Sequence, residues 1–513
     1  MLLAGLAATG CTPDAPALQG GWVGTHPERG HRLRGELPQA SGPLRKTGVL
    51  IVGGGIAGLA CARALARRGI DDFALLDLED QPGGNSRSHV VGSAPCPLGA
   101  HYLPLPGPEA HEVNELLHEL GLAREQAGRT VWDERWLCHS PQERLFIDGP
   151  NGGYWHDGLL PPPDGAASLA QYRHFSALVA RAQRGLGFAM PSHRTRWTAG
   201  HAALDAQPFA AWLDGQGLSD ARLRWYLDYC CRDDYGADAT TVSAWAGLHY
   251  FASRHGFHAP GDEAAEREPV LTWPEGNGWL SQRLAEPLRE RIHTGRTVLR
   301  VTEQRSGVEL LAWNEAAGAP ERWAARAVVM AAPLFVSARL LTAPPDALRA
   351  LKQRHAPWLT ASLLLREPLL TRPGAPPSWD NVRYGSTALG YVDARHQSLD
   401  PTPRPPLLTA YVALPAARRG ELLARPWQHW ARIVTAELAQ THPDLPAKVE
   451  RIALCRFGHA MSIPTPGLRG SAELAALNAQ RGRVVFAHGD LAGYSVFEEA
   501  YTVGVEAAER LSL

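Results

Sequence analysis

The sequence predicts an α/β protein in which a Rossmann-type dinucleotide-binding domain is interleaved with an α+β domain. Three observations lead to this prediction. An apolar strand at residues 49–52 runs into a glycine-rich turn, and a second apolar strand at residues 73–76 ends in an acidic residue. The chain also has 513 residues, of which 45% are hydrophobic and 20% charged. A folded chain of this length exceeds one hydrophobic core, so two or three domains are expected.

The glycine-rich turn has the spacing that a dinucleotide pyrophosphate requires. Its glycines are Gly53, Gly55 and Gly58, in the pattern G-x-G-x-x-G. The first permits a tight turn, the second lets the backbone approach the phosphates, and the third lets the next helix lie close to the strand. We expect that helix at about residues 56–68, with its N-terminus directed at the phosphates.

The second strand supplies a candidate ribose ligand. It ends at Asp77, which follows Gly58 by 19 residues, close to the spacing at which a carboxylate meets the ribose hydroxyls. Strand, turn, helix, strand and acid therefore occur in the order of a dinucleotide-binding unit. This order disfavours the simpler alternative, a glycine-rich turn that binds no nucleotide.

The residues after Asp77 resemble the second signature of the FAD-dependent amine oxidase and phytoene desaturase-like superfamily. That signature is an acid, five residues, two glycines and an arginine. Here Gly83 and Gly84 are followed by Asn85, and Arg87 lies two residues further on. An NAD-dependent dehydrogenase is the alternative with which these glycines conflict.

Other segments resemble the same family. Residues 97–102 are similar to its Asp-x-Gly-Ala-His segment beside the flavin, and residues 484–490 are similar to its closing strand and Gly-Asp motif. Ser495 and Glu498 form an S-x-x-E pattern that predicts the capped start of a helix facing the flavin. In relatives, the residue that matches Val298 contacts adenine through its backbone.

The resemblance implies FAD as the cofactor, held by residues from all of these segments. They are Gly53, Gly55, Ile56, Ala57, Gly58, Asp77, Leu78, Gly83, Gly84, Asn85, Arg87, Gly99, Ala100, His101, Tyr102, Val298, Gly489, Asp490, Val496 and Phe497.

The resemblance also implies how the domains are divided along the chain. The FAD-binding domain is expected at residues 46–105, 270–345 and 455–513, and the substrate domain at 106–269 and 346–454. Residues 1–45 are expected to be a signal-like or anchor-like segment followed by a linker, or an arm draped over the first domain.

A cluster of charged and aromatic residues lies in the expected substrate domain. Its members are Arg232, Asp233, Asp234, Tyr235 and Trp245. One interpretation is a pocket wall in which carboxylates and aromatic faces hold a cationic substrate. The other is an internal Arg–Asp pair that joins two helices, and the sequence leaves both open.

Three side chains are candidates for a catalytic role: His101, His459 and Tyr494. The family context places the histidines near the flavin ring, although a single histidine is more often structural. Many amine oxidases have a lysine near the reactive flavin nitrogen, and Thr360 occupies the expected position here.

These features predict an FAD-dependent oxidoreductase that takes a hydride from a C–H bond next to the nitrogen of an amine, with polyamines among the candidate small-molecule substrates. The first alternative is a C–C dehydrogenase or desaturase of the same superfamily. The second is an FAD-bound binding or assembly protein without turnover. Oxygen and a quinone both remain open as the electron acceptor, and the oligomeric state is not predicted.

Composition and termini limit the partners. A net charge of −1 gives no electrostatic case for nucleic acid, and seven scattered cysteines show no metal-ligand spacing. Residues 8–11, Ala-Thr-Gly-Cys, resemble the end of a bacterial lipoprotein signal. They predict export to the periplasm with a lipid on Cys11 at a membrane surface, and an ordinary N-terminus of a cytoplasmic protein is the alternative.

Overall fold

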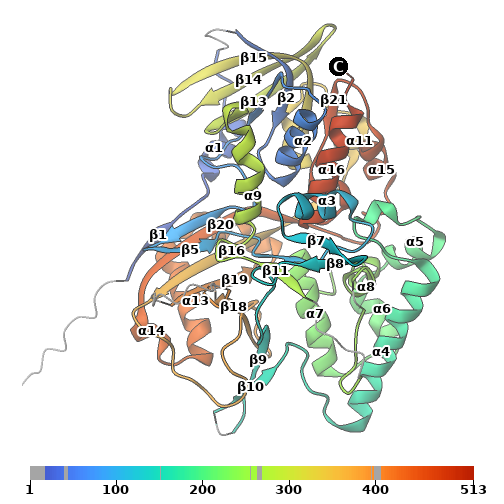
Figure 1. Cartoon of the computed structure of the whole chain (residues 1–513), viewed down its shortest axis with the longest axis vertical. Coiled ribbons are helices and arrows are strands. Elements are labelled where there is room, and N and C mark those ends of the chain that lie inside the picture. Colours follow the sequence, from blue (N-terminus) through green and yellow to red (C-terminus); the bar gives the residue numbers. More distant parts are fainter. Residues whose placement is uncertain are drawn as a thin grey trace, which may run out of the picture.

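The computed structural model describes residues 18–39, 44–150, 152–254, 256–262, 269–393, 395–397 and 406–512. Within these ranges the chain forms two large sheets, one of seven strands and one of eight, with helices packed against each (Figure 1). The predicted signal and lipid attachment at Cys11 lie outside the described residues. None of the helices in the described ranges is long and apolar enough to cross a bilayer.

The seven-stranded sheet is the predicted dinucleotide-binding sheet. Its order is β12-β3-β2-β15-β14-β13, and β21 also pairs with β15. The strands are β2 (Leu44–Val52), β3 (Phe73–Leu76), β12 (Ile292–His293), β13 (Arg296–Gln304), β14 (Gly307–Asn314), β15 (Ala319–Met330) and β21 (Val484–Phe486). All pairings except β13 with β14 and β14 with β15 are parallel. The central strands are continuous buried apolar runs, as expected where both faces of a parallel sheet are covered.

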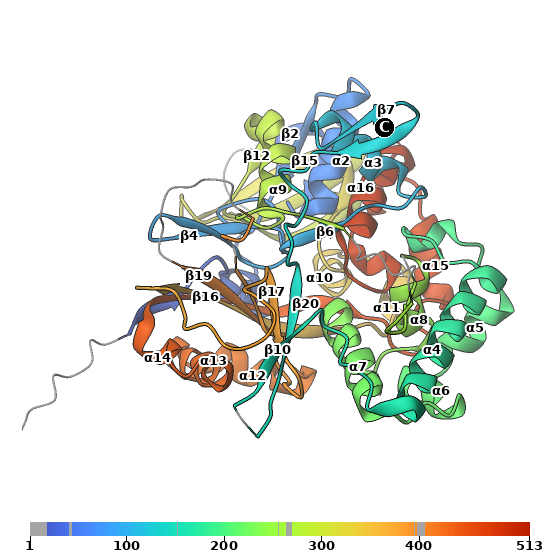
Figure 2. The ribbon, with the colours of Figure 1, turned by 60° about the horizontal axis from the view of Figure 1, so that its bottom comes forward.

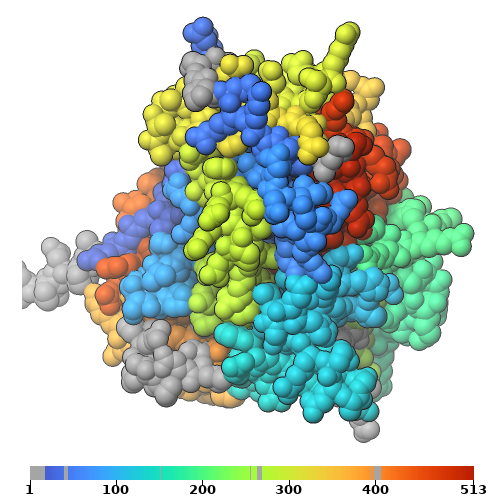
Figure 3. Space-filling view, turned by 45° about the horizontal axis from the view of Figure 1, so that its top comes forward, coloured from blue at the N-terminus to red at the C-terminus, as the bar shows by residue number. Residues whose placement is uncertain are grey.

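Helices cover this sheet and bring the C-terminus to the glycine-rich turn. α2 (Ile56–Arg67) follows the turn as predicted, and α16 (Phe497–Arg510) lies against it. The other helices here are α3 (His111–Glu119), α9 (Gly278–Ala285), α10 (Leu334–Leu340), α11 (Asp346–Ala350) and α15 (Ala472–Ala479). In Figure 3 the yellow-green α9 segment lies between α2 and the hairpin of β4 (Ser88–Val91) and β5 (Ala94–Pro97). Gln282 of α9 donates a hydrogen bond to Ser88 at 2.9 Å.

The eight-stranded sheet forms the base of the second part of the molecule. Its order is β1-β20-β16-β19-β18-β17-β9-β10. The strands are β1 (Gln19–Trp22), β9 (Glu143–Ile147), β10 (Tyr154–Asp157), β16 (Arg354–Leu365), β17 (Asp380–Arg383), β18 (Tyr391–Asp393), β19 (Leu407–Ala413) and β20 (Val449–Ile463). The predicted domain boundary between residues 454 and 455 falls inside β20, and the whole of that strand belongs to this sheet.

Two groups of helices accompany the eight-stranded sheet, which gives this part its α+β character. One group is α4 (Gly165–Leu186), α5 (Ala199–Asp205), α6 (Phe209–Gly215), α7 (Ala221–Tyr235) and α8 (Ala244–Ala252). The other is α12 (Arg419–Ala424), α13 (Trp427–Thr441) and α14 (Leu445–Lys448). Figure 2 shows the green helices of the first group on one side and the orange helices of the second on the other. Tyr172 and Phe175 fill the first core, and Trp430 fills the second.

Shorter elements connect these parts. They are α1 (Pro27–His31), the pair β6 (Tyr102–Pro104) and β11 (Val270–Thr272), the hairpin β7 (Ala123–Gln126) and β8 (Arg129–Trp132), and 3₁₀ turns at Arg32–Arg34, Ser192–Arg194, Glu286–Arg291, Ala416–Arg418 and Gly489–Ala492. The described part of the N-terminal segment, residues 18–39, therefore contains a strand and a short helix.

The predicted capping box at the start of the C-terminal helix is wrong. α16 begins at Phe497 with Val496 as its N-cap, and no side chain caps it. Ser495 Oγ instead accepts a hydrogen bond from the backbone N–H of Ser462 at 3.0 Å. The hydroxyl is used by a tertiary contact to β20, so the local S-x-x-E pattern does not determine the helix start.

Candidate functional site

A cavity of about 610 Å³ is lined by residues from both sheets. Most residues predicted to bind the cofactor line it: Gly53, Gly55, Ile56, Ala57, Asp77, Leu78, Gly83, Gly84, Asn85, Arg87, Gly99, Ala100, His101, Tyr102, Val298, Gly489, Val496 and Phe497. Gly58 and Asp490 are not among its lining residues. Segments far apart in the sequence thus meet around one space.

The glycine-rich turn fits a pyrophosphate. Gly53 has φ +111°, and a Cβ there would lie 2.5 Å from the carbonyl oxygen of Ala331. A Cβ on Gly58 would collide with the carbonyl oxygen of Gly53. At Gly55 a Cβ would meet only Gly84 Cα, at 3.9 Å, so the space next to this residue is open. The first N–H groups of α2 face the same space, which suits negatively charged phosphates.

Asp77 fastens the turn to β3 as well as facing the cavity. Its carboxylate accepts hydrogen bonds from the N–H of Gly54 at 2.6 Å and of Glu79 at 2.7 Å. Burial raises the pKa of the carboxyl, and the two N–H groups partly offset that effect. Each oxygen has a second lone pair, so the carboxylate can also accept from ribose hydroxyls.

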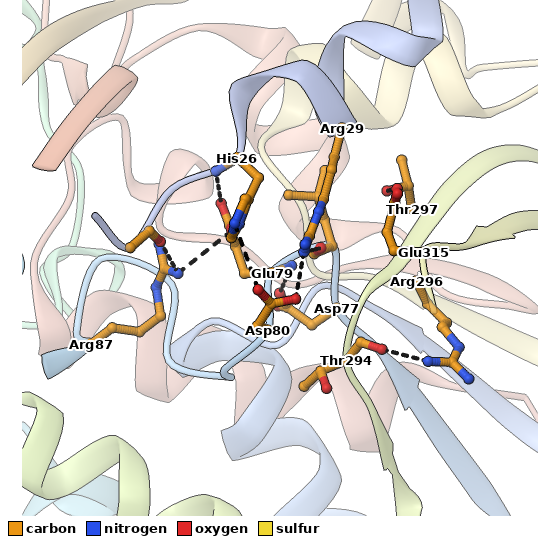
Figure 4. Close-up of polar contacts among 12 residues, drawn as sticks. His26, Arg29, Asp77, Glu79, Asp80, Arg87, Thr294, Arg296, Thr297 and Glu315 are labelled. Carbon is orange, nitrogen blue, oxygen red and sulfur yellow. Dashed lines mark hydrogen bonds and ion pairs between the residues drawn. The ribbon is translucent and has the colours of Figure 1, made fainter. Parts of the chain in front are cut away.

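The second glycine pair lies directly beside the turn. Gly83 forms an isolated bridge with Gly55, and Arg87 donates to the carbonyl oxygen of Gly84 at 2.8 Å. The Arg87 guanidinium also donates to the Gly24 carbonyl and lies 3.7 Å from Glu79 (Figure 4). Arg87, expected near the phosphates, therefore joins this loop to the N-terminal segment.

Asp490 lies behind the cavity wall, where it holds neighbouring segments together. Its buried carboxylate accepts from the N–H of Leu334 at 2.9 Å and contacts Nε2 of His355 at 3.0 Å. Burial raises the pKa of this carboxyl, but His488 and His355 outweigh burial and hold the pKa well below its usual range. The carboxylate was predicted to contact the cofactor, and the structure instead places the backbone of Gly489 at the cavity.

The N-terminus of α16 opens on the cavity with a carboxyl group in its first turn. Val496, Phe497 and Glu498 all line the cavity. Burial raises the pKa of Glu498 to about 7. A carboxyl that is neutral near pH 7 can donate a hydrogen bond to an acceptor on a bound ligand. The sequence had offered Glu498 only a capping role.

His101 lies in an aromatic wall of the cavity. Its ring stacks on Tyr411 with centroids 4.3 Å apart, and Trp379 lies 5.5 Å away. Burial lowers the pKa of His101 to about 3, so the imidazole is neutral at physiological pH. The Tyr411 hydroxyl is buried and has no hydrogen-bond partner among the described residues. This hydroxyl is thus enclosed by the protein, and other parts of Tyr411 line the cavity.

His459 lines a different part of the same cavity. The centroid of its ring lies 4.6 Å from that of Phe335 and 6.1 Å from that of His355. Neither of these rings is a neighbour of His101. Partial burial and the positive charge of Arg419 lower its pKa. The two predicted histidines therefore belong to separate subsites.

Tyr494 does not line the cavity. It is fully buried, donates a hydrogen bond to Glu499 at 2.6 Å, and lies 2.7 Å from Nε2 of His249. The structure thus gives Tyr494 a place in a buried polar network, in contrast to the predicted catalytic role.

The predicted acidic cluster separates into a structural part and a part that faces the cavity. Asp233 and Asp234 line the cavity. Arg254 binds Asp234 at 3.1 Å, whereas Arg232 binds Asp228 on its own helix at 2.9 Å. The internal Arg–Asp pair thus exists, with Arg254 in place of Arg232.

Tyr235 and Trp245, the other predicted substrate residues, lie in the core. Tyr235 donates to the carbonyl oxygen of Ala246 at 2.8 Å, and Trp245 stacks on His249 at 4.8 Å. Neither lines the cavity.

Asp233 is the carboxylate that remains available. Within the part of the chain that the structure describes, no hydrogen-bond or ion-pair partner is present for Asp233, which is screened from bulk water but partly exposed to the cavity. Burial and the charges of Asp234 and Glu143 raise its pKa to about 7. Asp380 carries a pKa raised well above its usual value by burial, Glu143 and Asp233.

Thr360 occupies the position at which a lysine was expected, and its side chain makes a structural contact. Its hydroxyl is buried and donates to the carbonyl oxygen of Leu98 at 2.8 Å. This bond ties β16 to the segment that carries His101. Among the described residues, no group of three or more His, Cys, Asp or Glu is placed to hold a metal ion.

Sequence reasoning missed several lining residues. Tyr411, Trp358 and Arg254 come from the second sheet and α8's end, and seven come from the N-terminal segment: Thr25, His26, Pro27, Gly30, His31, Leu33 and Arg34. No local motif marks the first group. The second group could have been suspected, because an arm draped over the first domain was expected.

Comparisons with known proteins agree with this geometry. A model of the flavin containing amine oxidoreductases matches residues 56–512. A hydroxyneurosporene desaturase from Rubrivivax gelatinosus is 47% identical over 118 residues, which are 21% of this chain and 20% of the desaturase. The chain thus aligns with about a fifth of that relative's length.

Solved structures resemble most of the chain. Putrescine oxidase bound to putrescine has a TM-score of 0.65 at 19% identity, over 91% of this chain and 99% of its own. Cyclohexylamine oxidase from Brevibacterium oxydans has a TM-score of 0.67 at 19% identity, over 90% and 98%. At these identities the likeness establishes a shared fold.

Proposed function

Because the chain belongs to the flavin-containing amine oxidoreductases, we propose that this flavin-dependent oxidoreductase oxidises a cationic amine at the C–H bond next to nitrogen. FAD, when bound, supplies the hydride acceptor. The residues of the chain bind the amine, orient it and exclude water.

The observation that carries this proposal is the available carboxylate of Asp233. It lines the same cavity as the cofactor-binding turn and has no partner among the described residues. A carboxylate in such a place gains most from a ligand that brings a positive charge and hydrogen-bond donors. A second ammonium group, as in a diamine, would meet this need while the reacting nitrogen lies elsewhere in the cavity.

The aromatic wall supports the same proposal. Tyr411 and Trp358 line the cavity, and aromatic side chains there can attract a cationic ligand and exclude water from it. His101 beside them stays neutral, so it does not repel a cation. A dry wall also favours the neutral form of the reacting amine, which is the form that can lose hydride.

A second candidate is dehydrogenation of a C–C bond. It is supported by the partial match to the desaturase and by Thr360 at the position expected for lysine. This reaction would use the apolar wall and would leave Asp233 without a substrate partner.

The test is an anaerobic titration of the purified protein with putrescine while the flavin absorbance is followed. We expect the flavin bands to bleach, and Asp233→Asn to require about tenfold or more putrescine for half bleaching, since a charge-assisted bond contributes about 1.5–3 kcal/mol. Asp214→Asn, at an exposed acid of α6, is the matched control and should behave as wild type.

Unchanged bands with putrescine and with cyclohexylamine would contradict amine oxidation. Bleaching by a nitrogen-free polyene would then favour C–C dehydrogenation. Equal putrescine requirements for wild type and Asp233→Asn would contradict the role of Asp233 alone.

Oxygen or a quinone as the acceptor, and export with a lipid on Cys11, are further proposals. Sequence residues 1–11 support the second. Reoxidation in air compared with reoxidation by a soluble quinone distinguishes the acceptors, and incorporation of labelled fatty acid that is lost in Cys11→Ser tests the anchor.

A further inference from the structure

The N-terminal segment crosses from one sheet to the other over the cavity. β1 pairs in parallel with the edge of β20, and Val23 N–H continues the pairing to Leu454 at 2.8 Å. Thr25 Oγ1 then donates to the carbonyl oxygen of Arg456 at 3.0 Å. α1 follows and lies beside the seven-stranded sheet (Figure 1), where Arg29 donates to the carbonyl oxygen of Leu78, two residues after β3. Residues 23–34, from the end of β1 to the turn after α1, are here named the clasp.

The clasp is held by Glu79 and Asp80, two acidic residues that lie shortly after Asp77 in the sequence. His26 Nδ1 lies 2.6 Å from a carboxylate oxygen of Glu79, and the backbone N–H of His26 donates to the other oxygen at 3.2 Å. Arg29 donates to Asp80 at 2.7 Å and to the carbonyl oxygen of Leu78 at 2.9 Å. Figure 4 shows the side chains of His26 and Arg29 reaching from the clasp to this acidic loop.

The backbone of the clasp also fits closely over the segment before His101. Gly24 has φ +76°, and a Cβ there would collide with the side chain of Leu98. Its carbonyl oxygen accepts from Arg87, which also holds Gly84 in the second glycine pair. The clasp is thereby connected to the loops that face the predicted phosphate position.

The clasp forms part of the cavity wall at its adenosine end. Thr25, His26 and Arg34 line the same cavity as Asp77, Leu78 and Val298. A five-residue helix such as α1 is not stable in isolation, so its position depends on these contacts. The family match begins at residue 56, so the clasp lies outside the matched region.

We propose that the clasp is part of the FAD-binding site and that it must detach before FAD can leave or enter. Its side chains bind Glu79 and Asp80, two acids that would otherwise repel the cofactor's phosphates. Its backbone covers the adenosine end, where the glycine-rich turn and Asp77 provide the opposite wall. The inference concerns retention of the cofactor and is independent of whether the substrate is an amine.

The first test measures FAD release from the holoenzyme. Protein is transferred to FAD-free buffer, and free FAD is followed by its fluorescence. We expect release to be about tenfold or more faster in Arg29→Ala, which removes the bonds to Asp80 and Leu78, and in Gly24→Ala, whose Cβ collides with Leu98 and displaces the clasp. The matched controls are Arg135→Ala, which removes an exposed arginine paired with Asp133 outside the clasp, and Gly21→Ala, where an added Cβ meets no atom within 4 Å.

Wild-type release rates in both clasp variants would overturn the proposal. So would equally fast release in the two controls. If one clasp variant does not fold, the FAD release rate of the other is compared with that of wild type.

A second test needs no substitution. Trypsin cleaves after arginine, and the clasp contains Arg29, Arg32 and Arg34. We expect these bonds to be protected in the wild-type holoenzyme and cut at least about tenfold faster once FAD has been removed, since local opening exposes the backbone. Equal cleavage with and without FAD would overturn the coupling between the clasp and the cofactor.

Discussion

Arg254 and Asp234 form a buried ion pair, with a guanidinium nitrogen 3.1 Å from the carboxylate. The two side chains are 9% and 6% exposed, so neither charge can turn to bulk water. The pair fixes Asp234 in the cavity wall, whereas its neighbour Asp233 has no partner among the described residues. Two adjacent aspartates therefore differ, one being held by the protein and the other being available to a ligand.

Loss of the buried pair should cost stability. We expect Asp234→Asn to lower the free energy of unfolding by about 3 kcal/mol, because the buried Arg254 keeps its charge and loses its carboxylate partner. Asp233→Asn should not be destabilising, since that carboxylate has no partner to lose. Urea denaturation of both variants checks this, and equal losses would show that the two aspartates are equivalent.

Alanine substitutions at two glycines of the phosphate turn should distinguish an effect on folding from an effect on cofactor binding. We expect Gly55→Ala to fold with a free energy of unfolding within about 1 kcal/mol of wild-type apoprotein, because its Cβ has room in the empty turn. The same methyl group occupies the predicted phosphate space, so the variant should purify without FAD.

Gly58→Ala should lose both folding stability and FAD binding, since its Cβ collides with Gly53. The flavin absorbance of each purified protein and thermal unfolding of each apoprotein give the comparison. A Gly55→Ala protein with full flavin content would contradict the assignment of the turn.

The residues that the sequence singled out from local motifs line one cavity in the structure. Gly53, Gly55 and Asp77 are among them, and they were predicted because a phosphate turn needs particular residues at fixed spacing. The parallel sheet followed from the same reasoning, because its strands are continuous apolar runs. The mixed α/β fold was confirmed by structures that match nearly the whole chain.

The part that could not be predicted depends on tertiary contacts. Tyr411 reaches the cavity from β19, and Arg254 replaces Arg232 as the partner of Asp234 through contact between α7 and the turn after α8. Tyr494 lies next to the flavin motif in sequence but points into the core, toward His249. The side chains of residues that are neighbours in the sequence can point in different directions. Closeness to the flavin motif in the sequence therefore did not reveal where the Tyr494 side chain lies.

Asp490 should influence FAD through the segments that it holds. We expect Asp490→Ala to purify largely flavin-free and its apoprotein to lose about 3 kcal/mol, because Leu334 N–H and His355 lose their buried acceptor. Flavin content and urea denaturation of the apoprotein are measured together. A flavin-free variant with wild-type apoprotein stability would instead indicate direct contact with the cofactor, and full flavin content would contradict any role in binding.

Tyr494→Phe should change stability more than turnover. The substitution removes a hydroxyl that joins Glu499 to His249, so we expect a loss of about 1–2 kcal/mol in the free energy of unfolding. The rate of flavin reduction by substrate should stay within about threefold of wild type, since Tyr494 does not line the cavity. Stopped-flow reduction checks this, and a loss of a hundredfold or more would restore the catalytic interpretation.

The raised pKa of Asp233 predicts a particular dependence of stability on pH. Burial and the neighbouring Asp234 raise this pKa from 3.8 to about 7. Between about pH 4 and pH 7 the folded protein therefore holds a proton that the unfolded chain has released, so this group's contribution to stability falls as pH rises through the interval and is constant above it. Asp233→Asn removes the contribution and also relieves Asp380, whose pKa Asp233 raises, so that the two effects on the stability difference have the same sign, whereas Glu498 titrates in both proteins. The variant should thus gain stability relative to wild type as pH rises from 5 to 7, with no further change at pH 8. Urea denaturation of the two proteins at these pH values measures the difference, and a difference independent of pH would show that the Asp233 carboxyl titrates near its ordinary value.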